Sequence, residues 1–162
     1  MISQMTNKNI SKKSGLTVVE IVVALAILAI LAGIGMRAFT NARTAKQLDT
    51  ITDSIATKLE EAKTNAMSGK DGTNFGLAFS TTTYTYWSGT SYSPSAESNN
   101  VFPISSNFSL TSTIPGTYHA VRFARITGTP DLTGSIVITS NDNASTTDTI
   151  TIGALGDITV IK

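Results

Sequence analysis

An apolar run with one carboxylate near its start constrains this chain more than any other feature of its sequence. Between Leu16 and Met36 the only ionisable side chain is Glu20, and residues 21–36 carry no charge. At about 1.5 Å rise per residue, a helix of this length extends about 30 Å, which is the thickness of the hydrocarbon core of a bilayer. The sequence therefore predicts a membrane-spanning helix over residues 16–36.

Positive charge precedes this run. Residues 1–15 contain Lys8, Lys12 and Lys13 and no acidic residue, whereas residues 16–162 hold nine basic and eleven acidic residues. Because lysines that flank a membrane helix stay on the cytoplasmic side, we expect the N-terminus inside and the rest of the chain outside the cytoplasmic membrane. A chain of 162 residues has room for this segment and one modest domain.

A helical pattern continues beyond the apolar run. Apolar residues recur at spacings of three and four residues while charged residues lie between them, which is typical of an amphipathic helix. The members of this stripe are Leu48, Ile51, Ile55, Leu59, Ala62 and Ala66. We expect one helix over about residues 16–67, with an amphipathic half at residues 37–68, and a stop at Gly69, since glycine tolerates the left-handed conformation that ends helices.

The pattern then changes to alternation of apolar and polar residues, as in half-buried strands. Two runs, at residues 75–79 and 83–86, are joined by Ser80, Thr81 and Thr82 and predict a hairpin. Further strands are predicted at residues 107–111, 118–126, 134–139, 147–152 and 157–161. The predicted fold class is α+β: a long N-terminal helix packed on an antiparallel β-sheet domain at residues 69–162.

Catalytic chemistry has little support in this composition. The chain has no cysteine and one histidine, His119, on a predicted strand, and it shows no paired carboxylates or glycine-rich phosphate loop at a recognisable spacing. We expect no enzyme and no cofactor. Trp87 and Tyr92 either form an exposed aromatic contact for a ligand or partner or, for Trp87, belong to the core.

Metal and nucleic-acid binding are also not predicted. Asn141, Asp142, Asn143 and Asp148 offer oxygen ligands for calcium, but their spacing does not fit an EF-hand loop, and a plain turn is the preferred interpretation. Arg122 and Arg125 are too few to neutralise a run of phosphates, and their spacing of three places them on opposite faces of a strand.

The nine residues from Lys12 to Glu20, KKSGLTVVE, resemble the class III signal of type IV pilins and type II secretion pseudopilins. The resemblance implies that a prepilin peptidase cuts between Gly15 and Leu16, removing residues 1–15 as a leader, and methylates the new amine of Leu16. It also implies that Glu20 meets the N-terminal amine of a neighbouring subunit and sets the register of assembly. Cleavage would thus create the partner that Glu20 lacks within the apolar run, where an unpaired carboxylate is costly.

Two details refine this resemblance. Arg37 stands where many family members have a helix-kinking proline, so Gly33 and Gly35 become the candidates for a flexible point or a close helix contact. The stretch from Ala120 to Asn143, together with the glycine-containing C-terminal hairpin, resembles the β domain of H-type minor pseudopilins and FimT-like minor pilins. Some FimT-like proteins bind DNA through basic residues near that hairpin, where this chain has Lys162 as its only basic residue.

We therefore expect a structural subunit of a type IV pilus or pilus-like filament, polymerised through its N-terminal helix. Its partners would be identical or related pilin subunits, the prepilin peptidase and an assembly platform, and it would end in an extracellular or periplasmic filament. Two alternatives stay open: a minor tip or initiating pseudopilin of a secretion or DNA-uptake system that binds a partner or DNA, and a membrane-anchored ligand-binding domain that never polymerises.

Overall fold

The computed structural model describes residue 15, residues 17–142 and residues 146–162, without the side-chain surroundings of residues 34, 35, 37 and 38. The chain divides into two compact units, Met1–Thr40 and Asn41–Lys162. The helix α1 (Val18–Met67) supplies the described secondary structure of the first unit and continues into the second. Each unit is described on its own below.

The helix ends where the sequence predicts. Gly69 adopts a left-handed conformation with φ of 66°, and its N–H donates to the carbonyl of Ala66 at 3.0 Å. The N–H of Ile126 donates to the same carbonyl at 2.9 Å, so a distant loop helps to cap the helix. These bonds satisfy a carbonyl that has no partner within the last turn. A short 3₁₀ turn, η1 (Lys70–Gly72), follows.

In the second unit the apolar stripe of α1 is buried, with one correction. Leu48, Ile55 and Leu59 are almost fully buried, but the residue that completes the buried row after Leu48 is Thr52, while Ile51 is only half-buried. With residue 52 in place of residue 51, the spacings along the buried row alternate between four and three residues, which matches the helical period of 3.6 residues more evenly. The prediction placed Ile51 on this row because Thr52 is polar.

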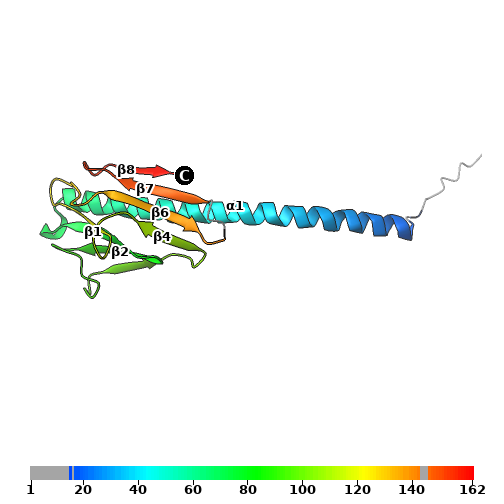
Figure 1. Cartoon of the computed structure of the whole chain (residues 1–162), viewed down its shortest axis with the longest axis horizontal. Coiled ribbons are helices and arrows are strands. Elements are labelled where there is room, and N and C mark those ends of the chain that lie inside the picture. Colours follow the sequence, from blue (N-terminus) through cyan, green and yellow to red (C-terminus); the bar gives the residue numbers. More distant parts are fainter. Residues whose placement is uncertain (1–14, 16, 143–145) are drawn as a thin grey trace, which may run out of the picture. The chain divides into compact units, whose positions relative to one another are not determined.

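Two four-stranded antiparallel sheets accompany this part of the helix (Figure 1). The first has the order β3-β2-β1-β5, with β1 (Phe75–Phe79), β2 (Thr83–Ser88), β3 (Asn100–Pro103) and β5 (Ala120–Phe123). The second has the order β4-β6-β7-β8, with β4 (Phe108–Ser112), β6 (Gly134–Ser140), β7 (Thr147–Ile152) and β8 (Ile158–Ile161). The predicted hairpin is confirmed, since Leu77 of β1 pairs with Tyr86 of β2.

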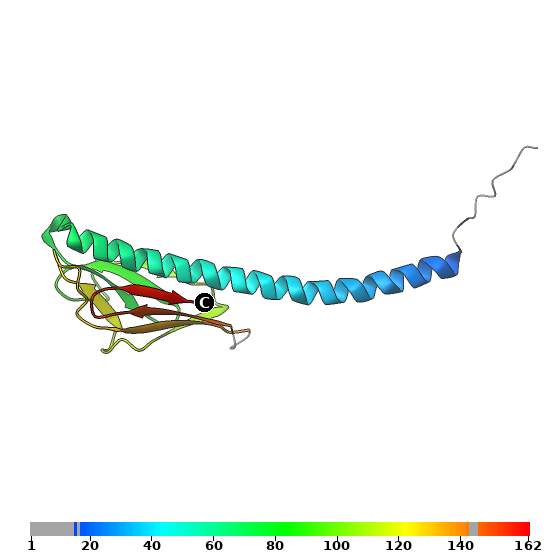
Figure 2. The ribbon, with the colours of Figure 1, turned by 90° about the horizontal axis from the view of Figure 1, so that it is seen from above.

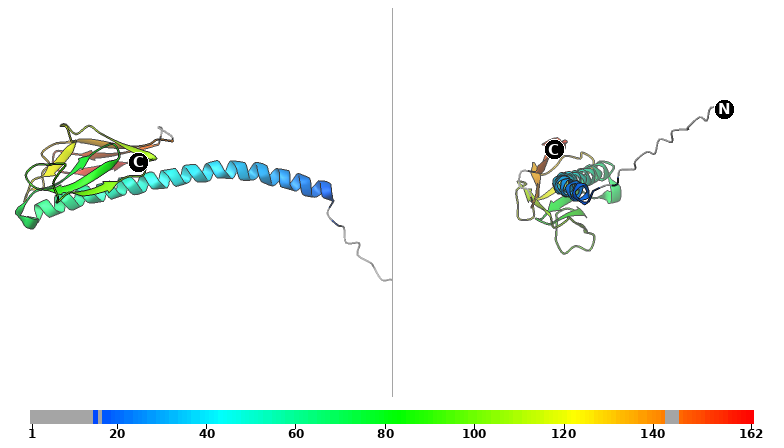
Figure 3. Two further views of the ribbon diagram at one scale, coloured as in Figure 1. Left: turned by 90° about the horizontal axis from the view of Figure 1, so that it is seen from below. Right: turned by 90° about the vertical axis from the view of Figure 1, so that its right-hand side faces the viewer.

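One hydrophobic core joins both sheets to the second part of the helix. Figures 2 and 3 show the strands gathered on one side of residues 41–67. The buried core side chains come from α1, from both sheets and from the connection after β4; its largest fully buried members are Phe108, Phe123, Leu48, Ile55, Leu59, Leu77, Ile114, Ile136, Ile138, Ile150, Ile152 and Val121. The predicted α+β class, with a helix on an antiparallel sheet domain, is confirmed.

Two strands differ from the prediction. Strand β3 was not predicted, because it is short, exposed and ends in Pro103, which is tolerated only at an edge such as this one. Strand β5 is shorter than the predicted run of residues 118–126, because His119 and Ile126 have left-handed backbones with φ of 46° and 74° and cannot continue a strand. Arg125 therefore lies beyond the strand, not on the face opposite Arg122.

Candidate assembly site

The predicted processing and register residues lie at the start of α1. The Thr17 hydroxyl accepts a hydrogen bond from the N–H of Glu20 at 3.2 Å, and the Thr17 carbonyl accepts one from Ile21 at 3.2 Å. Thr17 is thus the N-cap and Glu20 the third helical residue, which are the two positions of a capping box. A carboxylate at this place is favoured by the partial positive charge of the helix N-terminus.

Gly15 and Glu20 are both accessible in this arrangement. Gly15 is exposed, and no atom lies within 4 Å of the place where a Cβ would stand. Leu16, the predicted site of cleavage and methylation, lies outside the described residues. Glu20 is exposed, and no salt bridge to it is found in the part of the chain that the structure describes. Its carboxylate is therefore available to a group from another chain.

Apolar side chains are exposed all round the first part of the helix. Val18, Val19, Ile21, Val22, Val23, Leu25, Ile27, Leu28, Ile30, Leu31, Met36 and Phe39 are each between 47% and 78% exposed. Because runs such as residues 21–23 turn through more than half of the circumference, apolar side chains are exposed on every side of this segment. Such a surface requires an apolar environment that the chain itself does not supply.

Membrane insertion was predicted for this same segment. In the described part of the chain, the structure contains no helix with both the length and the hydrophobicity needed to cross a membrane. The span at residues 16–36 therefore stays a prediction.

The helix is continuous through the two glycines predicted to give flexibility. Gly33 is exposed, with no atom within 4 Å of a position for its Cβ. The surroundings of Gly35 lie outside the described residues. Among the described residues no packing contact to Gly33 is found, so its predicted role depends on neighbouring subunits.

A buried polar contact ties the helix to the second sheet and was not predicted. The Thr52 hydroxyl donates to a carboxylate oxygen of Asp148 at 2.7 Å, with both residues buried. Asp148, considered above as a calcium ligand, therefore bonds to the helix, while the Asn141 side chain donates to the carbonyl of Ser106 at 2.9 Å. Asn143, the remaining residue of that set near Asp142, lies outside the described residues. In the described residues no group of three His, Asp or Glu side chains is arranged for a metal ion.

Exposed ion pairs surround the same part of the helix. The Nζ of Lys162 lies 2.9 Å from Asp53 and 3.4 Å from Asp49, and the hydrogen bond to Asp53 is the largest cause that raises the pKa of Lys162. Lys58 lies 2.7 Å from Glu61, and this hydrogen bond raises the pKa of Lys58. The only basic residue of the C-terminal hairpin is thus held by two carboxylates.

The remaining residues considered above as contacts for a ligand or for nucleic acid mostly have structural roles. Trp87 is 3% exposed and belongs to the core, beside Gly76, where a Cβ would lie 2.9 Å from the indole ring. Arg122 lies 3.4 Å from Asp131 and donates to the carbonyl of Thr90, and Arg125 donates to the carbonyl of Gly72 at 3.4 Å. Both guanidinium groups thus contact the protein itself.

Comparison with known proteins finds a sequence motif in the first part of the chain and a similar fold in known structures. Residues 10–36 match a family model described as the prokaryotic N-terminal methylation motif. The fold matches the minor pseudopilin EpsH of the type 2 secretion system of Vibrio cholerae with a TM-score of 0.56 at 12% identity, covering 71% of this chain and 96% of that one.

A second solved structure also has a similar fold. The Pseudomonas aeruginosa type IV minor pilin FimU matches with a TM-score of 0.54 at 14% identity, covering 71% of this chain and 93% of that one. The chain is pilin-like in both motif and fold. No curated protein matches it by sequence. The resemblance to the type IV pilin and pseudopilin family, stated above from residues 12–20, is confirmed for this pilin-like chain.

Proposed function

We propose that this chain is a structural subunit of a type IV pilus or pilus-like filament. The leader, residues 1–15, is removed by a prepilin peptidase after Gly15, and Leu16 becomes the methylated N-terminus. Residues 16–36 hold the subunit in the cytoplasmic membrane before assembly and enter the filament core afterwards. Residues 37–68 form the amphipathic half of the helix, and residues 69–162 form the exposed β-rich domain.

The observation that carries this proposal is the apolar surface of α1. Twelve large apolar side chains between Val18 and Phe39 are at least 47% exposed, on a segment whose first turn carries the exposed carboxylate of Glu20. Bundled helices of identical subunits would cover these side chains, and repeated head-to-tail contacts of this kind generate helical filaments. The methylation motif over residues 10–36 supports the same assignment.

Glu20 sets the axial register in this proposal. An ionised carboxylate in an apolar bundle costs several kcal/mol unless it is paired. The amine that cleavage would free at Leu16 is a charge of the opposite sign, and it would come from a neighbouring subunit. The Thr17 hydroxyl caps the helix through the backbone N–H of Glu20, so the effect of the cap must be separated from that of the carboxylate.

The test is a comparison of processing and assembly in cells. Mass spectrometry of the N-terminus should find a chain that begins with methylated Leu16. Glu20→Ala should be processed and inserted normally but recovered in sheared filaments at a much lower yield than wild type. Thr17→Ala is the matched control, because it removes the cap and keeps the carboxylate. Normal filament yield from Glu20→Ala would overturn the register role, and an uncut chain from Met1 would overturn the whole proposal.

A minor tip or initiating pseudopilin is the second candidate. Its support is that both solved structures reported above are described as minor subunits, one of a secretion system and one of a pilus. The abundance of the processed chain in sheared filaments distinguishes the minor role from that of a main subunit. A processed chain that dominates sheared filaments supports the main subunit, whereas a processed chain at trace level supports the minor role. Either role is structural, and no catalytic function is proposed.

A further inference from the structure

An open cleft separates the two sheets at one end of the exposed domain. Its volume is about 590 Å³, within the range of about 300–1,000 Å³ that is usual for small-ligand sites. Its walls come from the turn between β1 and β2, from strand β4 and from the loop that precedes β5. The buried rings and aliphatic groups of Phe79 and Leu110 contribute an apolar floor.

Hydroxyl groups dominate the cleft walls. Six of these hydroxyls belong to Ser80, Thr81, Thr83, Ser109, Thr111 and Ser112. Among the lining residues, all of which lie in the described part of the chain, there is no Asp, Glu, Lys or Arg. A site without charges offers no partner to an ionic ligand, whereas hydroxyls both donate and accept hydrogen bonds. The lining therefore fits a neutral ligand that is rich in hydroxyl groups.

Aromatic rings line the same cleft. Tyr118 is 48% exposed, and its ring meets that of Tyr92 edge to face with centroids 5.4 Å apart. Tyr92 in turn lies 5.8 Å from the ring of buried Trp87. These contacts hold the two tyrosines in place at the cleft while leaving Tyr118 an open surface. An aromatic ring presents an apolar face beside a polar hydroxyl, a combination suited to the C–H face and hydroxyl edge of a sugar.

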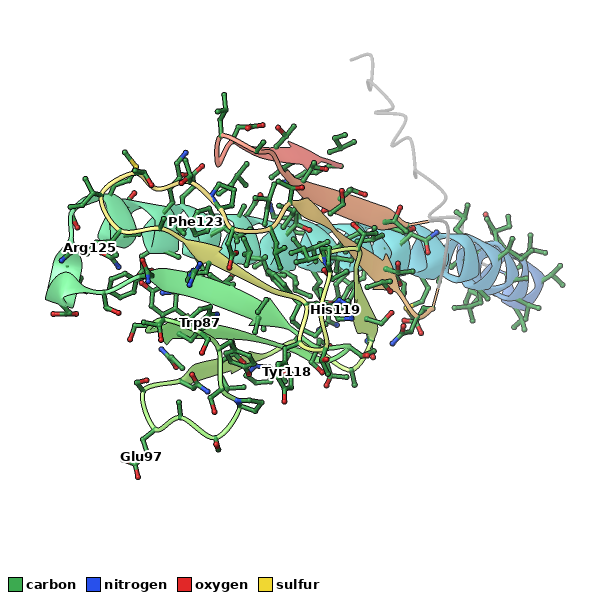
Figure 4. The ribbon with its side chains drawn as sticks, turned by 60° about the vertical axis from the view of Figure 1, so that its left-hand side comes forward. Trp87, Glu97, Tyr118, His119, Phe123 and Arg125 are labelled. Carbon is green, nitrogen blue, oxygen red and sulfur yellow. The ribbon has the colours of Figure 1, made fainter. Side chains whose placement is uncertain are left out.

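His119 lies next to Tyr118 in a constrained conformation (Figure 4). Its φ of 46° is rare for a residue other than glycine, and its Nδ1 lies 2.7 Å from the carbonyl of Ile114. That bond fixes the imidazole and assigns the proton to Nδ1, which leaves Nε2 as an acceptor. The N–H of Phe79 donates to the carbonyl of Tyr118 at 3.4 Å, so the loop is also attached to the first sheet.

From these features we propose that the cleft binds a neutral oligosaccharide. The hydroxyls of the walls pair with sugar hydroxyls, Tyr118 covers one sugar face, and His119 accepts a hydrogen bond through Nε2. Glu97, the acidic residue on the loop that carries Tyr92, is directed away from Tyr118 and His119 (Figure 4) and does not line the cleft. This inference concerns the exposed domain alone and does not depend on filament assembly.

The test uses the full chain in a zwitterionic detergent that has no sugar headgroup. The probes are neutral tetrasaccharides of glucose and of N-acetylglucosamine, with tetragalacturonate as the charged counterpart. Saturation-transfer NMR should detect a neutral probe and not tetragalacturonate. Trp87, the only tryptophan, reports on the cleft through Tyr92, so its fluorescence should change on the same titration.

Three variants locate the binding. Tyr118→Ala should weaken binding about tenfold, which corresponds to the loss of one aromatic contact. Thr111→Val on β4 should weaken binding several-fold, whereas Thr159→Val, an exposed threonine on β8 outside the cleft, should leave it unchanged. Absence of binding by every neutral probe at millimolar concentration, or binding that Tyr118→Ala does not weaken, overturns the proposal. Binding of an unstructured peptide with the same Tyr118 dependence, and no sugar binding, would assign the cleft to a peptide and also overturn it.

Discussion

The two parts of helix α1 use the same residue types for opposite purposes. Leu28, in the first unit, is 59% exposed, while Leu59, in the second, is fully buried against the two sheets. Both residues are strong helix formers, so local propensity does not distinguish them. The difference lies in where the partner is found. Residues 41–67 meet their apolar partners within the chain, and residues 18–40 must find theirs outside it.

Polar groups follow the same division. In the second unit Thr52 donates to Asp148 at 2.7 Å, and Lys162 lies between Asp49 and Asp53. In the first unit Glu20 bonds through its backbone N–H to Thr17, and no salt bridge to its carboxylate is found in the described residues. The comparison supports the proposal that the first unit forms an interface, whereas the second unit is a folded domain.

Substituting one leucine in each unit tests this division most directly. Leu59→Ala should lower the free energy of unfolding of the domain by about 2–5 kcal/mol, since it leaves a cavity in a filled core. Leu28→Ala should leave thermal unfolding of the domain unchanged and reduce the yield of sheared filaments. Circular dichroism melts and filament recovery measure the two effects. A melt of Leu28→Ala lowered as much as that of Leu59→Ala would contradict the division.

A pair of threonines on the helix gives the next largest contrast. Thr52→Val should destabilise the domain by about 1–3 kcal/mol, because it leaves the buried Asp148 carboxylate without its donor. Thr50→Val is the matched control, since the Thr50 hydroxyl is exposed and donates to the carbonyl of Lys46 in its own helix. Denaturant unfolding compares the two variants with wild type. Equal midpoints for the two variants would show that the buried bond contributes nothing.

Thr52 also shows how far the sequence predicts the helix. Period and spacing correctly predict the helix, its end near Gly69 and five of the six stripe residues as buried, because these follow from local geometry. They place Ile51 on the buried row in error, since a polar residue is buried only when it has a partner. That partner, Asp148, is 96 residues away in the sequence, and no local pattern reveals it.

The candidate sites divide in the same way. The start of α1 is predictable because Gly15, Thr17 and Glu20 are near neighbours in the sequence and form one motif. The cleft is not predictable, because its walls come from the β1–β2 turn and the loop at Tyr118 on the side of the first sheet and from β4 of the second sheet, and only the packing of the two sheets brings them together. Trp87 and Tyr92 were the single signal of it, and Trp87 belongs to the core.

Gly33→Ala tests the first unit by adding one methyl group. Within the chain no atom obstructs a Cβ there, and alanine favours a helix over glycine by about 1 kcal/mol, so helix content should not fall. Filament yield should fall, because either a close helix contact or a flexible point needs the glycine. Ala32→Ser, one residue away and about 100° around the helix, is the control. Normal filaments from Gly33→Ala would remove Gly33 from the assembly surface.

The smallest effect is expected for Lys162→Met, which removes an ion pair on the surface of the second unit. The hydrogen bond to Asp53 is the largest cause that raises the pKa of Lys162 above its ordinary value of 10.5 in the folded state. The stabilisation by this ion pair is therefore complete below pH 10.5 and is lost as the pH rises through the higher pKa of Lys162 in the folded chain.

Because the side chains of Lys162 and Asp53 are exposed, salt should screen the pair. The melting temperature of the variant should thus lie slightly below that of wild type at neutral pH and low salt, and the difference should vanish at high salt or above the raised pKa. A difference that persists in high salt would mean that the aliphatic stem of Lys162 packs on the helix and that its charge is incidental.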